Sequence, residues 1–169
     1  MAASENAFEL RIAPVEGAGD LASALAIREI VFIEEQSVPQ GMERDEEDAK
    51  AFHLLAYDGL HAIGTGRLVV LKKPPEGERG KWGRIGRMAV LATWRHRGVG
   101  RAVLNALEEE ARRRKLEGVV IHAQLIARDF YRAQGYHDAS PIFDEAGMPH
   151  VEMRKPLWIT PPTGPAEVY

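Results

Sequence analysis

The spacing of apolar residues predicts several strands and one helix in the first half of the chain. Residues 8–12 alternate between apolar and polar side chains, which is typical of a half-buried strand. Residues 52–57 and 62–71 predict a hairpin, because the Asp58-Gly59 pair between them favours a tight turn. The apolar positions that follow Leu21 recur at helical spacing, and Asp20 is placed to cap that helix. The segment 72–80, rich in lysine, proline and glycine, predicts a surface loop.

The second half combines a long two-sided helix with short strands. Residues 85–90 predict a strand, and apolar side chains spaced along residues 99–111 predict the inward face of a helix. On that helix Glu108, Glu109 and Glu110 each precede an arginine by four positions, a pairing that contributes about 0.2–0.5 kcal/mol each. Gly118 is expected to break the chain before another strand, and Gly135 to end a short helix. The last strands flank a turn at residues 145–147.

Composition excludes several classes of protein. With 169 residues, 45% of them hydrophobic, the chain is expected to form a single domain over 1–169, with a proline-rich tail at 156–169. A net charge of -3 argues against general attraction to nucleic acid. The absence of cysteine excludes disulfides and thiolate metal sites. The sequence shows no membrane-spanning run and no signal-peptide pattern, so the cytoplasm is the expected compartment and no membrane partner is predicted.

A glycine-rich turn between the predicted strand 85–90 and the long helix carries the clearest chemical signal. Its sequence is Arg95-His96-Arg97-Gly98-Val99-Gly100-Arg101. Glycines let the backbone N–H groups approach a ligand closely, and the first turn of a helix has N–H groups without partners and a partial positive charge. With the flanking arginines, this arrangement predicts a cradle for a pyrophosphate. Taken alone, the same pattern is also typical of a glycine-rich loop that only caps a helix.

A second block, Gln124 to Tyr136, gives the cradle its context. The two blocks together resemble the GNAT acetyltransferase superfamily, in which the first binds the pyrophosphate of acetyl-CoA and the second has the form N-x-x-A-x-x-F-Y-x-x-x-G-F/Y. This chain has Gln124 where that pattern usually has asparagine. Residues 27–39, followed by Glu43, Asp45, Asp48 and His53-Leu54, and the segment Gly147 to Met153 are similar to the ElaA-type branch of these proteins. The similarity extends over about residues 8–155, which implies that these residues form the core of the domain.

The resemblance implies a fold, a co-substrate and a set of contacts. The fold is α/β (α+β), a mixed, mostly antiparallel sheet of about seven strands flanked by helices. The co-substrate is acetyl-CoA, whose peptide-like arm would lie along the strand before the cradle while the following strand splays away. The implied contacts comprise Met88, Ala89, Val90, Arg95, His96, Arg97, Gly98, Val99, Gly100, Arg101, Gln124, Ala127, Phe130 and Tyr131.

The resemblance also implies roles in catalysis. Tyr131 occupies the position of the acid that protonates the leaving thiolate, and a backbone N–H near Met88 would stabilise the oxyanion. Glu35 and His150 are the preferred candidates for the base that deprotonates the amine, beside Glu34, His53 and Glu152, and water remains an alternative.

The histidine spacing predicts no metal site. The acceptor is expected to be the primary amine of a small molecule or peptide. If the acidic segment 43–48 lined the acceptor mouth, it would attract a cation such as a polyamine. A non-catalytic acyl-CoA sensor and an autoinducer-synthase-like acyltransferase remain alternatives, and a homodimer is left open.

Overall fold

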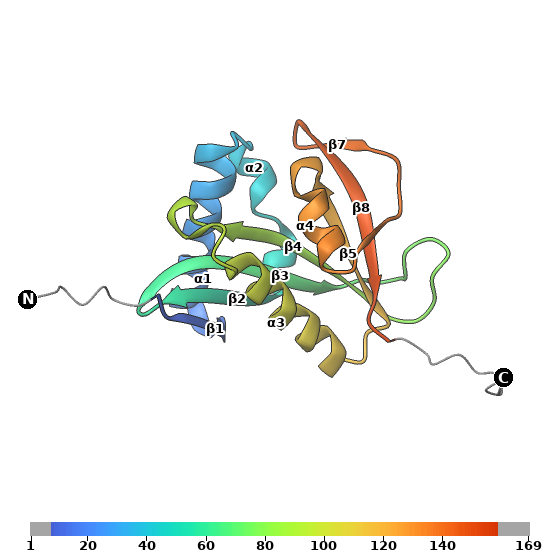
Figure 1. Cartoon of the computed structure of the whole chain (residues 1–169), viewed down its shortest axis with the longest axis horizontal. Helices are drawn as coiled ribbons and strands as arrows, with labels where there is room; N and C mark the ends of the chain where they lie inside the picture. Colours follow the sequence, from blue (N-terminus) through green and yellow to red (C-terminus); the bar gives the residue numbers. More distant parts are fainter. Residues whose placement is uncertain (1–7, 159–169) are drawn as a thin grey trace, which may run out of the picture.

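The computed structural model describes residues 8–158, which form one eight-stranded sheet with helices on both faces (Figure 1). The strand order is β1-β2-β3-β4-β5-β8-β6, and β7 pairs with β8. The strands are β1 (Leu10–Pro14), β2 (Phe52–Asp58), β3 (His61–Val70), β4 (Trp82–Val90), β5 (Gly118–Gln124), β6 (His137–Asp138), β7 (Phe143–Glu145) and β8 (Met148–Pro156). Every pairing is antiparallel except that of β4 with β5, so the predicted mixed, mostly antiparallel sheet is confirmed, with eight strands instead of about seven.

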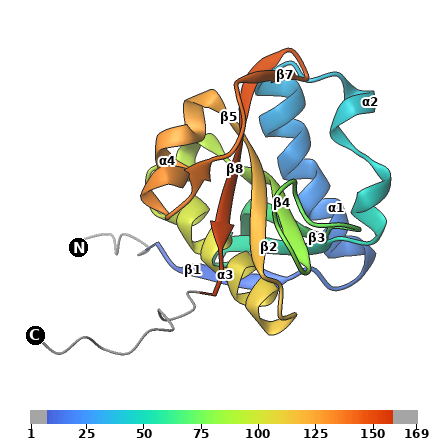
Figure 2. The same ribbon diagram turned by 90° about the vertical axis from the view of Figure 1, so that its right-hand side faces the viewer.

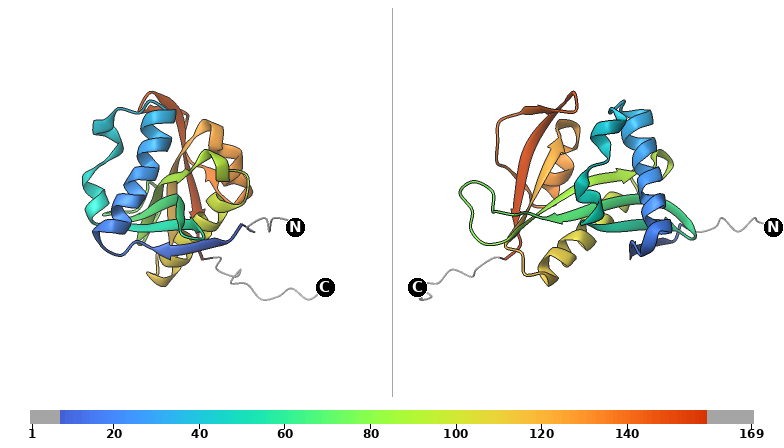
Figure 3. Two further views of the ribbon diagram at one scale, coloured as in Figure 1. Left: turned by 90° about the vertical axis from the view of Figure 1, so that its left-hand side faces the viewer. Right: turned by 180° about the vertical axis from the view of Figure 1, so that it is seen from behind.

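The helices divide between the two faces of the sheet. They are α1 (Gly17–Arg28), which continues into the π-helical η1 (Glu29–Glu35), then α2 (Gln40–Glu43), α3 (Val99–Arg113) and α4 (Arg128–Ala133). Three 3-10 turns complete the helical elements: η2 (Glu46–Ala49), η3 (Ala92–Trp94) and η4 (Leu125–Ala127). In the front view α3 and α4 lie before the strands, and from behind α1 and α2 lie before them (Figures 1 and 3).

Two apolar clusters hold these layers together. The larger lies between the sheet and α3, whose predicted stripe Val99, Val103, Leu104, Leu107 and Ala111 is fully buried there. The smaller joins α1 and η1 to the other face of the sheet. Because α3 is packed over its whole length, its N-terminus is fixed relative to β4 and β5.

Strands β4 and β5 separate from one another after a short pairing. Their parallel ladder joins only residues 82–84 to residues 118–120, and beyond it the two strands diverge (Figure 2). Strand β5 stays paired with β8 along its whole length, so the opening lies between β4 and β5 alone. The separation exposes the edge of β4 from Ile85 to Val90 and creates a cleft within the sheet.

A bulge in β4 marks the centre of this opening. Thr65 pairs with Ala89 and Arg67 with Gly86, so β4 carries two residues, Arg87 and Met88, opposite the single Gly66 of β3. Arg87 has a φ of 52°, which accommodates the extra residue. A Cβ on Gly66 would lie 2.6 Å from Met88 Sδ, so this glycine leaves the space that the Met88 side chain fills.

Three local expectations are corrected. Helix α1 begins at Gly17 instead of near Leu21, because the Asp20 carboxylate accepts a hydrogen bond from the Glu16 N–H inside the first turn. Gly118 is the first residue of β5 and does not break the chain. A glycine is needed there because the Trp82 ring lies so close that a Cβ would be 2.5 Å from it.

Of the three expected pairs on α3, the one between Glu110 and Arg114 forms, at 3.1 Å. Glu108 is buried and binds Lys155 Nζ at 2.9 Å, and Glu109 binds Arg112 at 2.7 Å instead of Arg113. Pro156 ends β8, and Pro161, Pro162 and Pro165 lie outside the described residues.

Candidate active site

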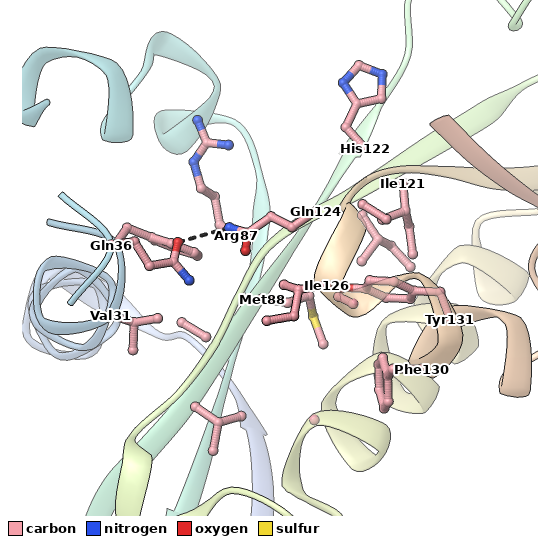
Figure 4. A pocket seen from close by; sticks show the side chains of 18 of the residues that line it. Val31, Gln36, Arg87, Met88, Ile121, His122, Gln124, Ile126, Phe130 and Tyr131 are labelled. Atoms are coloured by element: carbon pink, nitrogen blue, oxygen red, sulfur yellow. Dashed lines mark hydrogen bonds between the residues drawn. The ribbon is translucent and has the colours of Figure 1, made fainter. Parts of the chain in front are cut away.

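A cavity of about 700 Å³ occupies the opening between β4 and β5. It is lined by the end of η1, the second half of β4, the N-terminus of α3, the end of β5, and the segments η4–α4 and β7–β8. Figure 4 shows Met88 in its middle, Phe130 and Tyr131 on one side, and Val31 and Gln36 on the other. The cavity therefore joins two sides of the sheet, one facing α3 and α4 and the other facing the N-terminal helices.

The predicted cradle lies at one end of this cavity. Gly98 is the N-cap of α3 with a φ of 83°, and the first helical hydrogen bond runs from the Ala102 N–H to the Gly98 carbonyl. The N–H groups of residues 99–101 therefore have no partner within the helix. A Cβ on Gly100 would come no closer than 3.8 Å to Phe130, so this turn is open to a ligand. The geometry fits a pyrophosphate bound by backbone donors.

The predicted co-substrate contacts converge on the cavity with one exception. Met88, Ala89, Val90, Arg95, His96, Gly98, Val99, Gly100, Arg101, Gln124, Ala127, Phe130 and Tyr131 all line it. Arg97 does not line it and instead lies over the Phe8 ring, 5.8 Å from its centroid. Arg95 is held by a hydrogen bond from its Nε to the Val90 carbonyl.

Tyr131 is positioned by aromatic packing rather than by its hydroxyl. Its ring makes edge contacts with Phe130 at 5.0 Å and Tyr136 at 5.8 Å. Within residues 8–158 its hydroxyl has no hydrogen-bond partner, although the residue is only 6% exposed and lines the cavity. Burial raises the pKa of the Tyr131 hydroxyl above its ordinary value, so the group is protonated at neutral pH. A protonated hydroxyl without a partner can donate to a ligand.

The two preferred base candidates are placed differently. His150 is buried on β8 and lines the cavity, whereas Glu35 does not line it and forms an ion pair with Arg95 at 2.6 Å. The His150 Nδ1 lies 2.8 Å from the Met148 carbonyl, which can only accept, so Nδ1 carries a proton. His150 Nε2 is then the nitrogen that can gain or lose one, and it lies 3.5 Å from the Glu145 carboxylate.

Several residues that line the cavity were not predicted from the sequence. Gln36, Arg84, His122 and Glu145 line the cavity, and the first of these accepts a 2.9 Å hydrogen bond from the Gln124 side-chain amide (Figure 4). His122 could have been found from strand alternation, since it lies two positions before Gln124 on β5. The hydrogen bond with His122 holds the pKa of Glu145 below its ordinary value, so that carboxylate is ionised.

Three carboxylates of the acidic segment 43–48 bind arginines. Glu43 is 2% exposed and forms an ion pair with the fully buried Arg28. Asp48 binds Arg28 and Arg67 at 2.7 Å each, and Asp45 binds Arg67 at 2.7 Å. These carboxylates are committed to arginines, which fixes α2 and η2 beside the bulge of β4. The exposed Glu46 and Glu47 are the carboxylates of this segment left for a cation, and its attraction of a polyamine stays a prediction.

No helix between residues 8 and 158 is long and apolar enough to cross a membrane. Over the same residues, no three histidine, aspartate or glutamate side chains converge as they would around a metal ion.

Comparison with known proteins places this geometry in context. Residues 20–157 match the model of the acetyltransferase (GNAT) domain. The uncharacterized N-acetyltransferase YjcF of Bacillus subtilis is 36% identical over 136 residues, covering 80% of this chain and 91% of that protein. A candidate N-acetyltransferase from Lactobacillus plantarum has a TM-score of 0.76 and 31% identity, covering 88% of this chain and 99% of that one. Escherichia coli ElaA has a TM-score of 0.73 at 21% identity, covering 86% of this chain and 99% of that one.

Proposed function

The chain belongs to the GNAT acetyltransferase family, and from this premise we propose that it transfers the acetyl group of acetyl-CoA to a primary amine of a small molecule or peptide. The observation that carries the proposal is the single cavity that joins the α3 cradle, the free edge of β4 and Tyr131. Family membership makes the chain an N-acetyltransferase that uses an acyl-CoA. The choice of acetyl-CoA and of the acceptor is our inference from the cavity.

Each part of the cavity has a role in this proposal. The N–H groups of residues 99–101 and the side chain of Arg101 bind the pyrophosphate, and the β4 edge from Met88 to Val90 binds the peptide-like arm. Acetyl-CoA supplies a thioester, whose carbonyl carbon accepts the amine nitrogen. We assign the stabilisation of the oxyanion to a backbone N–H near Met88, beside the bulge at Arg87.

Two proton movements complete the transfer. The amine nitrogen loses a proton as it bonds to the carbonyl carbon, and His150 Nε2 is the best-placed acceptor for it, directly or through water. The carbon–sulfur bond then breaks, and the Tyr131 hydroxyl donates its proton to the departing sulfur. Glu35 is retained as a second base candidate, although its ion pair with Arg95 favours a role in positioning that arginine.

A binding experiment tests the cradle. Acetyl-CoA should raise the melting temperature of the wild type by mass action on the folded state. The variant Gly98→Glu places a carboxylate where the pyrophosphate would bind and should abolish that rise. The matched control is Gly77→Glu, because Gly77 lies in a remote loop with nearly the same φ, 82° against 83°. The Gly77→Glu variant has the same backbone strain, and acetyl-CoA should still raise its melting temperature.

Turnover separates an enzyme from a sensor. Release of free thiol from acetyl-CoA is followed in the presence of a panel of primary amines. Thiol release that depends on an amine supports the proposal. A melting-temperature rise without turnover of any amine would favour a non-catalytic acyl-CoA sensor, and the absence of both would remove the cavity as the acyl-CoA site.

A further inference from the structure

The sheet face toward the N-terminal helices carries charged and polar side chains beside the cavity. Along β4, β5 and β8, the residues Arg84, His122 and Glu152 alternate with Ile85, Ile121 and Met153, whose side chains are buried. Figure 4 shows the same division on β5, where Ile121 points toward Tyr131 and His122 points away from it. This polar face is the side from which an acceptor would meet the bulge of β4.

Arg84 is the unusual member of this face. It is half-buried, and within residues 8–158 its guanidinium forms no hydrogen bond and no ion pair, although its charge is among the causes that lower the pKa of Glu145. It lies between the cavity and a second hollow of about 360 Å³, which Lys72, Lys73 and His122 also line. A half-buried guanidinium without a partner keeps unused donors suited to a carboxylate.

The nearby carboxylates are already engaged by other groups. Glu145 contacts His122 at 3.3 Å and His150 at 3.5 Å, and Glu152 binds Arg154 at 2.7 Å. Glu76, which lines the second hollow, is exposed to solvent. Asp45 binds Arg67 and Arg87. Of the two arginines of β4 that line the cavity, Arg87 binds Asp45, and Arg84 is therefore the one without a hydrogen bond or ion pair within residues 8–158.

Resting on the proposed function, we propose that the acceptor amine carries a carboxylate and that Arg84 binds it. Arg84 precedes Met88 by four positions on β4, but because of the bulge this stretch runs beside only three residue steps of β3, from Val69 to Gly66, or roughly 10 Å at about 3.3 Å per residue. The arginine side chain spans part of that distance. The carboxylate of the acceptor therefore lies several bonds from its amine, as in a long ω-amino acid or a short peptide, and not adjacent to it as in an α-amino acid.

Matched acceptors measure the carboxylate directly. The assay compares kcat/KM for 6-aminohexanoate with hexylamine, for glycine with methylamine, and for triglycine with triglycine amide. We expect a preference for the acid of at least ten-fold in the long pairs and none in the glycine pair. The ω-amino acid and the peptide pair distinguish a small-molecule acceptor from a peptide one.

The variant Arg84→Gln tests the assigned residue. It should reduce the acid-to-neutral ratio of kcat/KM in the long pairs by about 10- to 100-fold, the value of one charge-assisted contact. Within residues 8–158 the substitution breaks no hydrogen bond and no ion pair, so the melting temperature should change little. The control Arg79→Gln removes the same charge from an exposed position in the preceding loop and should keep the wild-type ratio.

The outcomes distinguish this inference from the proposed function. Turnover of the neutral amines at equal or higher kcat/KM than the acids, or an unchanged ratio in Arg84→Gln, would overturn the carboxylate site and leave the acetyltransferase assignment intact. Absence of turnover with every acceptor, acid and neutral, would contradict the proposed function and this inference with it.

Discussion

The Gln124 side-chain amide donates a 2.9 Å hydrogen bond to Gln36 Oε1, 88 positions earlier in the chain. Gln36 caps the end of η1 and Gln124 ends β5, so the bond spans the cavity between the N-terminal helices and the splayed half of the sheet (Figure 4). Glutamine is one methylene longer than the asparagine usual in the family pattern. That extra length gives the amide a partner on the opposite wall of the cavity.

A double-mutant cycle should detect this bond. Gln124→Asn shortens the side chain and Gln36→Ala removes its partner, so each single variant should lower the free energy of unfolding by about 0.5–1.5 kcal/mol. Because both remove the same contact, the double variant should lose less than the sum of the two. The measurement is chemical denaturation of the four proteins. Additive losses would show that the two amides do not interact in solution.

The paired tyrosines should respond in opposite ways. Tyr131→Phe removes a hydroxyl without a partner in the described chain, so stability should hold while turnover falls by roughly one to three decades. Tyr136→Phe removes a buried hydroxyl that donates to Glu108 at 3.3 Å. It should lower the melting temperature by a few degrees and largely spare turnover. Thermal melts and thiol release measure both, and equal turnover in Tyr131→Phe and wild type would leave Tyr131 as packing alone.

The family motifs and the hydrophobic periodicity together predict the cofactor half of this molecule well. The stripe from Val99 to Ala111 identifies α3, and the glycine-rich turn before it identifies the cradle. Both signals are local in sequence, so they can be read without knowledge of the fold. The order of the strands in the sheet could be predicted only from the family resemblance. No pattern within the sequence of β4 or β5 indicates that the two strands separate after Arg84.

The acceptor half could not be predicted in the same way. Its side chains come from η1, β4, β5 and β7–β8, and their meeting depends on the register of the sheet. Asp45 and Asp48 show the difficulty, because a run of acidic residues normally indicates a solvated loop, whereas here buried Arg28 and Arg67 bind it. Long-range ion pairs of this kind have no signature in sequence spacing.

The ion pairs of Asp48 should make stability fall in acid. Burial alone would raise the pKa of Asp48, but its contacts with Arg28, Arg67 and the Asp45 N–H hold that pKa well below the ordinary value. The pKa is thus lower in the folded than in the unfolded chain. The stabilisation is complete above about pH 5 and is lost progressively as the pH falls below about 4, where the unfolded carboxylate takes up a proton.

Asp48→Asn measures this contribution. It should lower the free energy of unfolding at pH 7 by roughly 3 kcal/mol, because it leaves the buried Arg28 guanidinium without one of its partners. It should also flatten the decline between pH 5 and pH 3. Asp129→Asn is the control, because it removes the same charge from a side chain that is 97% exposed. A decline as steep in Asp48→Asn as in the wild type would assign the acid sensitivity to other carboxylates.

The pH dependence of turnover should identify the base. Removal of a proton acceptor reduces the rate most at low pH, where little of the amine is already neutral, and least at high pH. We therefore expect turnover by His150→Ala to be at least ten-fold lower than wild type near pH 6 and progressively less reduced toward pH 9, while acetyl-CoA still raises its melting temperature.

Glu35→Gln should show a smaller loss of turnover, because Glu35 binds Arg95 and does not line the cavity. His61→Ala, at an exposed position at the start of β3, controls for loss of an imidazole. A loss in His150→Ala that is the same at every pH would make His150 a positioning residue, and a pH-dependent loss confined to Glu35→Gln would transfer the role to Glu35.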